Sequence, residues 1–257
     1  MNGTVQYDDT IHRYYVGSQT YTSATQLVEN FKNKFETERM AEWMEHRYGN
    51  TKEYWIAKWK KDNSDSLDRG NSIHEREEKK LLLKGYDLQP FPVPVQESQE
   101  DVDYYQLPDG VYPELKLWRH DCALAGRADK VYLYTVPTGM TPTRLQNGFR
   151  YEVTRYMTLD DHKTNKIIRT ESFQNWETKK FAMMLGPLSH LMDCEMVHYS
   201  LQLSIYQYMG EYHGFQPGRR RIIHHRHPVP GISSTGPKIT ELPYLRNEVI
   251  AMLKSII

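Results

Sequence analysis

The residues best suited to chemistry begin with an aspartate and a lysine two positions apart, Asp161 and Lys163. They lie at the end of a segment, 150–161, whose pattern predicts a strand. Side chains two residues apart in a strand point to the same side, so the carboxylate and the ammonium share one face. Such a carboxylate can hold a hard cation, and the ammonium can orient or deprotonate a water. Alone, however, the pattern also fits an ordinary exposed strand end.

A second acid, Asp129, lies at the start of the apolar strand predicted over 127–135. Gly126 before it permits a tight entry or a close approach of another group to the backbone. Two carboxylates on neighbouring strands can share one divalent ion, and Mg²⁺ is typically held by one or two carboxylates with water and phosphate oxygens. The alternative is a surface aspartate that pairs with Arg127 or Lys130.

Two further pairs are spaced four residues apart on predicted helices. His74 and Glu78 share a helix face and offer a further ligand and a supporting carboxylate, unless this face is simply charged and solvated. The stretch is not the zinc-protease motif H-E-x-x-H, because position 78 is glutamate. Gln202 and Tyr206 lie beside an apolar stripe, where they either line a site or are hydrogen-bonded groups at a buried edge.

The order of these pieces along the chain is more specific than any one of them. It runs through Gly70-x-x-x-His74-x-x-x-Glu78, Glu114, Gly126-x-x-Asp129, Asp161-x-Lys163-Thr164 and Gln202-x-x-x-Tyr206. In this order the chain resembles the PD-(D/E)XK nuclease superfamily, most closely its RecB-like branch, which includes the mitochondrial genome maintenance exonuclease. The stretches 8–28 and 184–209 also resemble phage-encoded exonucleases. The resemblance extends over about residues 7–225.

The resemblance implies a role for each matching residue. His74, Asp129 and Asp161 would be metal ligands together with the backbone carbonyl of His162, and Lys163 would be the catalytic lysine. Glu78 and Glu114 would be supporting acids near the metal. Gln202 and Tyr206 would position the lysine or the phosphate backbone. The implied cofactor is Mg²⁺, with Mn²⁺ able to substitute.

The chain departs from the family pattern in three respects. Asp160 occupies a position that is usually apolar, although only Asp161 has a lysine two residues later. The stretch from Asp129 to Asp161 is longer than a tight hairpin needs and indicates an extra loop or hairpin. The cysteines of the iron–sulfur branch are missing, so no iron–sulfur cluster is expected.

The implied activity is a metal-dependent DNA exonuclease that serves phage recombination, repair or DNA degradation. Two alternatives stay open: a restriction-like or structure-specific endonuclease, and a non-catalytic nucleic-acid-binding module on the same fold. The expected partner is DNA with single-stranded or duplex ends. Because the chain has no G-x-x-x-x-G-K-[ST] motif, a motor function would require a helicase partner, and a single-strand-binding or annealing partner is also compatible.

A DNA path needs basic side chains, and the densest basic stretch is RRRIIHHRH at 219–227. Its arginines are Arg219, Arg220, Arg221 and Arg226. Among them we expect Arg219, Arg221 and Arg226 to track phosphates, although a basic exposed edge strand is an equal alternative. Exposed rings among Trp43, Trp55 and Trp59 would suit base stacking, but we expect most of them in the core.

Composition sets the outer limits. The chain has 257 residues, with 33 basic and 33 acidic side chains, so its net charge is zero and any basic surface must be local. Hydrophobic residues make up 39%, as in a folded globular protein rather than a disordered one. No run of apolar residues is long enough to span a membrane, no secretory signal is recognisable, and two cysteines fit a reducing compartment, so a cytoplasmic location is expected.

The pattern of elements predicts a single α/β (α+β) domain over 1–257 with a restriction-endonuclease-like core, in which helices flank a central mixed sheet. Residues 1–88 would form a hairpin and a mostly helical region with the His/Glu motif, and 89–257 the catalytic sheet and its covering helices. The expected strands are a hairpin at 5–21 and segments at 111–118, 127–135, 150–161 and 219–227. The expected helices are one after Ser23, two within 36–62 broken near Gly49, and others at 67–83, 171–185, 188–212 and 243–256.

Overall fold

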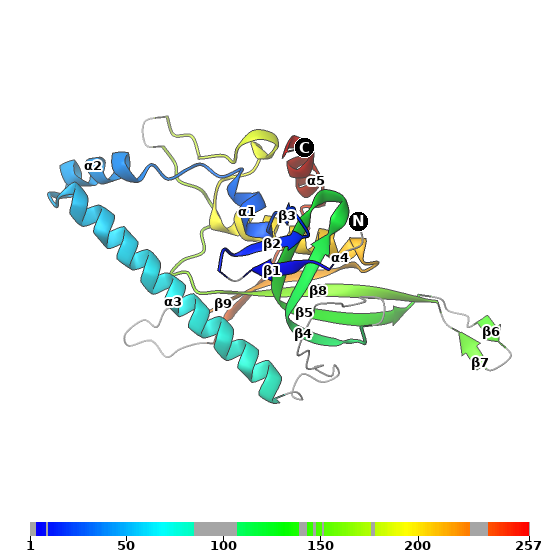
Figure 1. The fold of residues 1–257 in the computed structure, drawn as a ribbon. Helices are drawn as coiled ribbons and strands as arrows, with labels where there is room; N and C mark the ends of the chain where they lie inside the picture. The colour runs from blue at the N-terminus through cyan, green and yellow to red at the C-terminus, as the bar shows by residue number, and fades with distance from the viewer. Residues whose placement is uncertain are drawn as a thin grey trace.

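A five-stranded mixed sheet with helices against it forms the centre of the molecule (Figure 1). The structure is a computed structural model that describes residues 4–8, 10–84, 107–138, 143–145, 148–150, 152–175, 178–226 and 236–256. The order across the sheet is β10-β9-β8-β5-β4. The strands span Gly110–Arg119 (β4), Leu124–Pro137 (β5), Val153–Lys163 (β8), Gln216–His224 (β9) and Lys238–Glu241 (β10).

The strands β4, β5 and β8 form an antiparallel meander, whereas β9 runs parallel to β8. A parallel neighbour requires a crossover, which here contains the helix α4, Glu195–Tyr212. Buried side chains of α4 and of α5, Arg246–Ile256, share one core with the sheet, including Leu201, Met252 and Leu159. A short 3₁₀ turn, His120–Cys122, links β4 to β5. The prediction of a mixed sheet flanked by helices is therefore confirmed.

The N-terminal segment forms a small antiparallel sheet of three strands rather than a single hairpin: β1 (Gln6–Asp8), β2 (Arg13–Val16) and β3 (Gln19–Tyr21). Gly17 turns the chain between β2 and β3 with a positive φ of 57°. The helix α1, Ala24–Glu29, follows directly, and Ser23 caps it as predicted in a capping box with Gln26.

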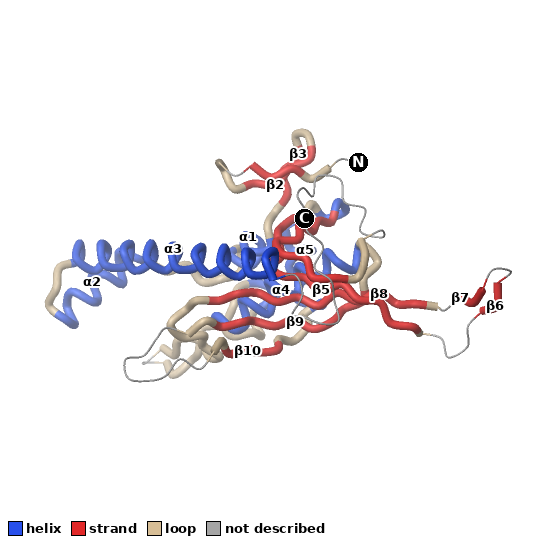
Figure 2. The backbone as a smooth tube through the Cα atoms, turned by 90° about the horizontal axis from the view of Figure 1, so that it is seen from below, coloured by secondary structure: helices blue, strands red, loops and turns tan. Residues whose placement is uncertain are grey.

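Two helices form an arm that projects from the sheet (Figures 1 and 2). They are α2, Thr37–Tyr48, and α3, Lys52–Lys84, and the break between them falls at Gly49 as predicted. The prediction of a second break between 62 and 67 is wrong, because α3 is one helix of 33 residues. The prediction relied on residues that often form turns, but Ser66 donates its hydroxyl to the carbonyl of Asp62 within the helix, at 2.7 Å.

The helix predicted over 171–185 is also wrong, since the described part of this segment contains bridges and turns. Phe181 pairs with Gln174, Lys179 has a left-handed backbone, and Gly186–Leu188 forms a 3₁₀ turn that contains Pro187. Consequently α4 begins at Glu195, not near 188. The helical composition of the segment is overruled by these tertiary contacts.

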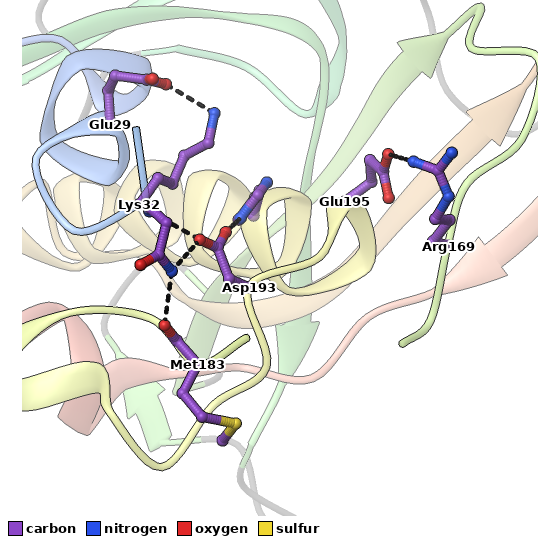
Figure 3. Close-up of polar contacts among 8 residues, drawn as sticks. Glu29, Lys32, Arg169, Met183, Asp193 and Glu195 are labelled. Carbon is purple, nitrogen blue, oxygen red and sulfur yellow. Dashed lines mark hydrogen bonds and ion pairs between the residues drawn. The ribbon is translucent and has the colours of Figure 1, made fainter. Parts of the chain in front are cut away.

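Asp193 fastens this irregular segment to the end of α1 and the start of α4 (Figure 3). Its carboxylate accepts hydrogen bonds from the backbone and side-chain amides of Asn33, at 2.7 and 2.6 Å, and lies 2.6 Å from His198 Nε2. Asn33 also donates to the carbonyl of Met183 at 2.7 Å. One carboxylate thus joins three separate parts of the chain.

The other predicted elements agree in place, with shifted ends. The last predicted strand and helix correspond to β9 and α5, while β10 was not expected. A two-stranded extension, β6 (Thr143–Leu145) and β7 (Gly148–Arg150), occupies the predicted long connection between Asp129 and Asp161. The predicted division between 1–88 and 89–257, and His227 of the predicted basic stretch, lie outside the described residues. Within the described ranges, no helix combines the length and apolar character needed to cross a membrane.

Candidate functional site

Three neighbouring strands bring acids to one end of the sheet. The ladder between β4 and β5 passes from the pair Pro113–Lys130 to the pair Leu115–Ala128, so Glu114 and Asp129 lie opposite each other between them. Glu114 has a positive φ of 49°, which interrupts the regular ladder at this step. In the ladder between β5 and β8, Lys130 pairs with Asp160. The next position along the two antiparallel strands therefore places Asp161 beside Asp129. Local strand geometry thus gathers three carboxylates.

The arm adds a histidine to this group. His74 of α3 places Nδ1 at 3.2 Å from Asp129 Oδ2, and the backbone N–H of His162 donates to the same oxygen at 2.8 Å. Arg69, one and a half turns before His74, donates to the backbone carbonyls of His225 and Arg226 at 3.4 and 3.3 Å. These contacts hold α3 against the end of the sheet.

His74, Glu114 and Asp129 form the group of side chains that can hold a metal ion. One ligand atom from each lies within 4.8 Å of the others, and no second group of this kind occurs among the described residues. Glu114, predicted as a supporting acid, thus belongs to the ligand group itself. Asp161, predicted as a ligand, is not part of this set. Carboxylate oxygens and an imidazole nitrogen suit a divalent cation, and which cation binds is left open by geometry alone.

The charges of this group are poorly compensated without a cation. Burial raises the pKa of Glu114 to about 8, and the neighbouring carboxylates Asp129 and Glu78 contribute to the rise. Burial and repulsion by Asp161 also raise the pKa of Asp129, against the opposing effects of His74 and Lys163. Acids with raised pKa values in a partly buried cluster are typical of sites that hold a cation or transfer protons.

Lys163 supplies the positive charge of the site. Its ammonium lies 2.7 Å from Asp161 Oδ2, and its side chain is only 16% exposed. Burial by itself would lower the pKa of Lys163, but Asp161 and Asp129 more than offset burial and raise it. The ammonium also lies 4.7 Å from the ring centroid of Tyr199. Lys163 is therefore a fixed cation beside the acids, as the strand spacing predicted.

Tyr206 of α4 forms a wall of the site. A Cβ at Gly126 would lie only 2.7 Å from Cε1 of the Tyr206 ring, so the close approach predicted for this glycine is made by the tyrosine. Burial, Asp129 and Asp161 raise the pKa of Tyr206 well above its usual value, while a hydrogen bond with Gln202 lowers it. Tyr206 is therefore close enough to feel the charges of Asp129 and Asp161, and Gln202 is linked to them through its hydrogen bond with Tyr206.

His162 and Asp160 point to the opposite face of β8. His162 Nδ1 lies 2.8 Å from His225 Nε2, and burial together with Lys130 and His225 lowers the pKa of His162 to about 3. Asp160 accepts two hydrogen bonds from Arg221, at 2.6 and 3.0 Å, and lies 3.6 Å from Lys130 Nζ. Asp160 is thus a structural acid, while the carbonyl of His162 as a ligand stays a prediction.

The arginines of the predicted basic strand differ in whether they contact a buried carboxylate. Arg221 is engaged with Asp160, whereas Arg219 is exposed and lies 4.0 Å from Glu241. Arg226 is exposed beyond the end of β9. The carboxylate contact of Arg221 competes with phosphate binding, so Arg219 and Arg226 are the better candidates for a DNA path.

The expectation that most of the first tryptophans are core residues is wrong. Trp43 is 48% exposed, and Trp55 and Trp59 are half-buried on the arm. Together with other rings they form a continuous series of contacts with centroids 5.3 to 6.4 Å apart: Phe35–Trp59, Trp59–Trp55, Trp55–Tyr54, Trp55–Tyr48 and Tyr48–Trp43. The arm therefore presents aromatic surface instead of burying it.

Two residues at the site were not predicted. Tyr199, which covers Lys163, lies three and seven residues before Gln202 and Tyr206, so helical spacing alone could have found it. Arg69 had no comparable signal, because its partners are backbone carbonyls more than 150 residues away.

Comparison with known proteins adds no family assignment. No protein-family model matches the chain, and no curated protein matches it. The features that bear on function are therefore those of the site itself, in which His74, Glu114, Asp129, Asp161 and Lys163 lie together.

Proposed function

We propose that the chain is a divalent-metal-dependent deoxyribonuclease of the PD-(D/E)XK superfamily that degrades DNA from its ends. One observation carries the proposal: acids from three strands, a histidine from α3 and a lysine from β8 meet at one end of the sheet. The mixed sheet flanked by helices supports the expected restriction-endonuclease-like core. Recombination, repair or degradation of phage DNA, in the cytoplasm of the host, is the setting that we propose.

The residues fit a resident divalent cation. His74, Glu114 and Asp129 would hold it, with Asp161 close by, and Mg²⁺ or Mn²⁺ suits this mainly carboxylate set. The raised pKa of Glu114, about 8, reflects burial first and then the charges of the neighbouring carboxylates Asp129 and Glu78, which a bound cation would offset. Such a cation neutralises phosphate charge and lowers the pKa of a bound water towards 7.

The side chains of the protein supply the rest of the chemistry. Lys163 holds its ammonium beside the acids, where it stabilises the negative charge that builds up on the phosphate during hydrolysis. Tyr199 and Asp161 fix the position of that ammonium. Tyr206 and Gln202 form a rigid wall, since Tyr206 is buried against Gly126. DNA is the proposed partner, with a helicase or an annealing protein as a further candidate.

The test uses end-labelled linear single-stranded DNA, linear duplex and covalently closed circles, each incubated with Mg²⁺ or Mn²⁺. We expect the linear DNA to be degraded and the closed circles to remain intact. Lys163→Ala should slow cleavage by at least about 100-fold, as loss of one preorganised donor does, while metal binding by calorimetry persists. Asp129→Asn should lose metal binding.

Lys238→Ala, which truncates a lysine on β10, serves as the matched control and should retain full activity. Cleavage of closed circles would replace the exonuclease proposal with an endonuclease. Failure to cut any substrate, with DNA binding retained, would favour a non-catalytic binding module.

A further inference from the structure

A cavity of about 500 Å³ lies between α3 and the segment that follows β8. Residues 62–67 of α3 form one wall and residues 164–169 the other. The cavity is distinct from the acidic group, which lies towards the C-terminal part of α3. Its volume is within the range of about 300–1,000 Å³ found for sites that hold small ligands.

Two large aliphatic side chains line this cavity from opposite elements. Leu67 of α3 is 59% exposed, and Ile167 of the facing segment is 65% exposed. Neither side chain is covered by the core, although both belong to residue types that are usually buried. Together they offer two apolar surfaces to a flat, weakly polar group.

Polar groups accompany the aliphatic pair. Asn63 and Asn165 line the same cavity, and carboxamides are suited to the polar edge of a nucleobase. The hydroxyl of Tyr199 donates to Asn165 Oδ1 at 2.7 Å, which fixes the orientation of this amide. Because Tyr199 also covers Lys163, the cavity and the catalytic lysine share a rigid neighbour.

The charge of the facing segment suits a phosphate. Lys166 and Arg169 both line the cavity, and Arg169 reaches Glu195 at 2.9 Å on the exposed side (Figure 3). On the α3 wall, Asp62 lies 3.2 Å from Lys58 and is thereby compensated. Because Arg169 is engaged with Glu195, Lys166 is the better candidate for a phosphate contact. A cation beside an apolar pair suits the charged backbone and the bases of single-stranded nucleic acid.

The cavity adjoins the site directly. Thr164, which lines it, follows Lys163 in the chain, and a Cβ at Gly70 would lie 3.8 Å from Thr164 Oγ1. Arg69 holds α3 to the end of the sheet at the same level. The helix therefore approaches the strand end closely, and the cavity between them stays partly open to solvent, where Leu67 and Ile167 are exposed.

We propose that this cavity binds one unpaired nucleotide of the DNA strand, next to the phosphate that is cleaved. Leu67 and Ile167 contact the two faces of its base, the asparagines its polar edge, and Lys166 the adjoining phosphate. This inference rests on the proposed nuclease function and adds that the strand in the site is single.

The test measures the binding of a 5′-labelled single-stranded oligonucleotide by fluorescence anisotropy in EDTA, where no cleavage occurs. The double variant Leu67→Ala, Ile167→Ala should raise the Kd about fivefold or more, the lower end of what loss of one stacked base costs. Ile239→Ala, an equally exposed truncation on β10, should leave the Kd unchanged. Binding of a blunt duplex of the same sequence should not change in any of these variants.

A second measurement replaces single bases by abasic sites along the oligonucleotide. Wild-type protein should lose affinity strongly at one position, and the double variant should lose none there. Lys166→Ala, which leaves the apolar pair intact, should make the salt dependence of binding shallower by about 0.7 in the log–log slope, as for one lost phosphate contact.

Equal losses at every abasic position, or a double variant that binds like the wild type, would overturn the inference. The two proposals fail separately. DNA cleavage with no effect of the cavity variants would remove the nucleotide site alone. Binding that depends on Leu67 and Ile167 in a protein that cuts no DNA would remove the nuclease alone.

Discussion

The sheet with its covering helices and the arm formed by α2 and α3 are stabilised in opposite ways. Trp118 on β4 is 8% exposed and contacts His213 edge-on, with ring centroids 5.3 Å apart. Trp43 on α2 is 48% exposed, and Ala41 is the only buried residue of that helix. The sheet thus owes its stability to apolar burial, while the arm relies on ring edges and polar contacts.

This difference separates stability from site geometry. Glu114, Asp129 and Lys163 belong to the well-packed sheet, but His74 belongs to α3 and reaches Asp129 through a contact of 3.2 Å. A change on the arm can therefore displace a ligand without unfolding the protein. A change in the sheet core should unfold the protein before its effect on catalysis can be measured.

The largest expected effect comes from truncating the same residue type in both places. Trp118→Ala should lower the free energy of unfolding by about 3–5 kcal/mol, because it opens a cavity in a packed core. Trp43→Ala should lower it by less than about 1 kcal/mol, since much of its ring is already in water. Urea unfolding of both variants measures this, and similar losses would show that the arm is as tightly packed as the sheet.

A somewhat smaller effect is expected where charge replaces apolar packing inside the sheet. Asp160→Ala leaves Arg221 and Lys130 without their buried carboxylate, which should cost about 3 kcal/mol. The matched variant Glu241→Ala removes an exposed carboxylate 4.0 Å from Arg219 on the same sheet and should cost less than about 1 kcal/mol. Thermal unfolding that ranks the two variants equally would contradict the assignment of Asp160 as a structural acid.

The smallest effect concerns the join between α1 and α4 and depends on pH. Burial would raise the pKa of Asp193, but hydrogen bonds from Asn33 and His198 outweigh burial and lower it. A lowered folded-state pKa contributes stability above the unfolded value of 3.8, and this contribution is lost as pH falls through the folded pKa. Asn33→Ala should therefore cost about 1–2 kcal/mol at pH 7 and progressively less below pH 4.

Urea unfolding of wild type and Asn33→Ala at a series of pH values provides that measurement. Lys32→Ala, which removes the neighbouring exposed pair with Glu29, is the control and should cost little at any pH. A difference between Asn33→Ala and wild type that stays constant with pH would show that the ionised form of Asp193 is not what Asn33 stabilises.

The sequence predicted those parts of the molecule where local pattern and tertiary structure agree. Alternating strands around Asp129 and Asp161, the cap at Ser23 and the four-residue spacing of Gln202 and Tyr206 all survive, because each follows from short-range geometry. The segment 171–185 did not, since Asn33, far away in the sequence, fixes its course through hydrogen bonds to Met183 and Asp193. Long-range polar contacts of this kind leave no periodic trace in a sequence.

At the site too, the parts that follow from short-range pattern were predicted and the parts that depend on the fold were not. Spacing in the strand placed Lys163 with Asp161, and the order of motifs brought in His74. The position of Glu114 within the ligand group depends on its left-handed backbone, and the residues around it contain no pattern that predicts this conformation. Likewise the rings of the arm have the composition of a core, and only the fold shows that Trp43 is 48% exposed and that Trp55 and Trp59 are half-buried.

The left-handed backbone of Glu114 has a consequence for how this chain can change over generations. A residue with a side chain is held there at a cost of about 1 kcal/mol or more, which glycine would avoid. Selection for stability alone would therefore favour glycine at this position, and a glycine would remove the carboxylate. If the acid is retained among descendants of this sequence, it is retained by selection on what the carboxylate does and against what the fold prefers.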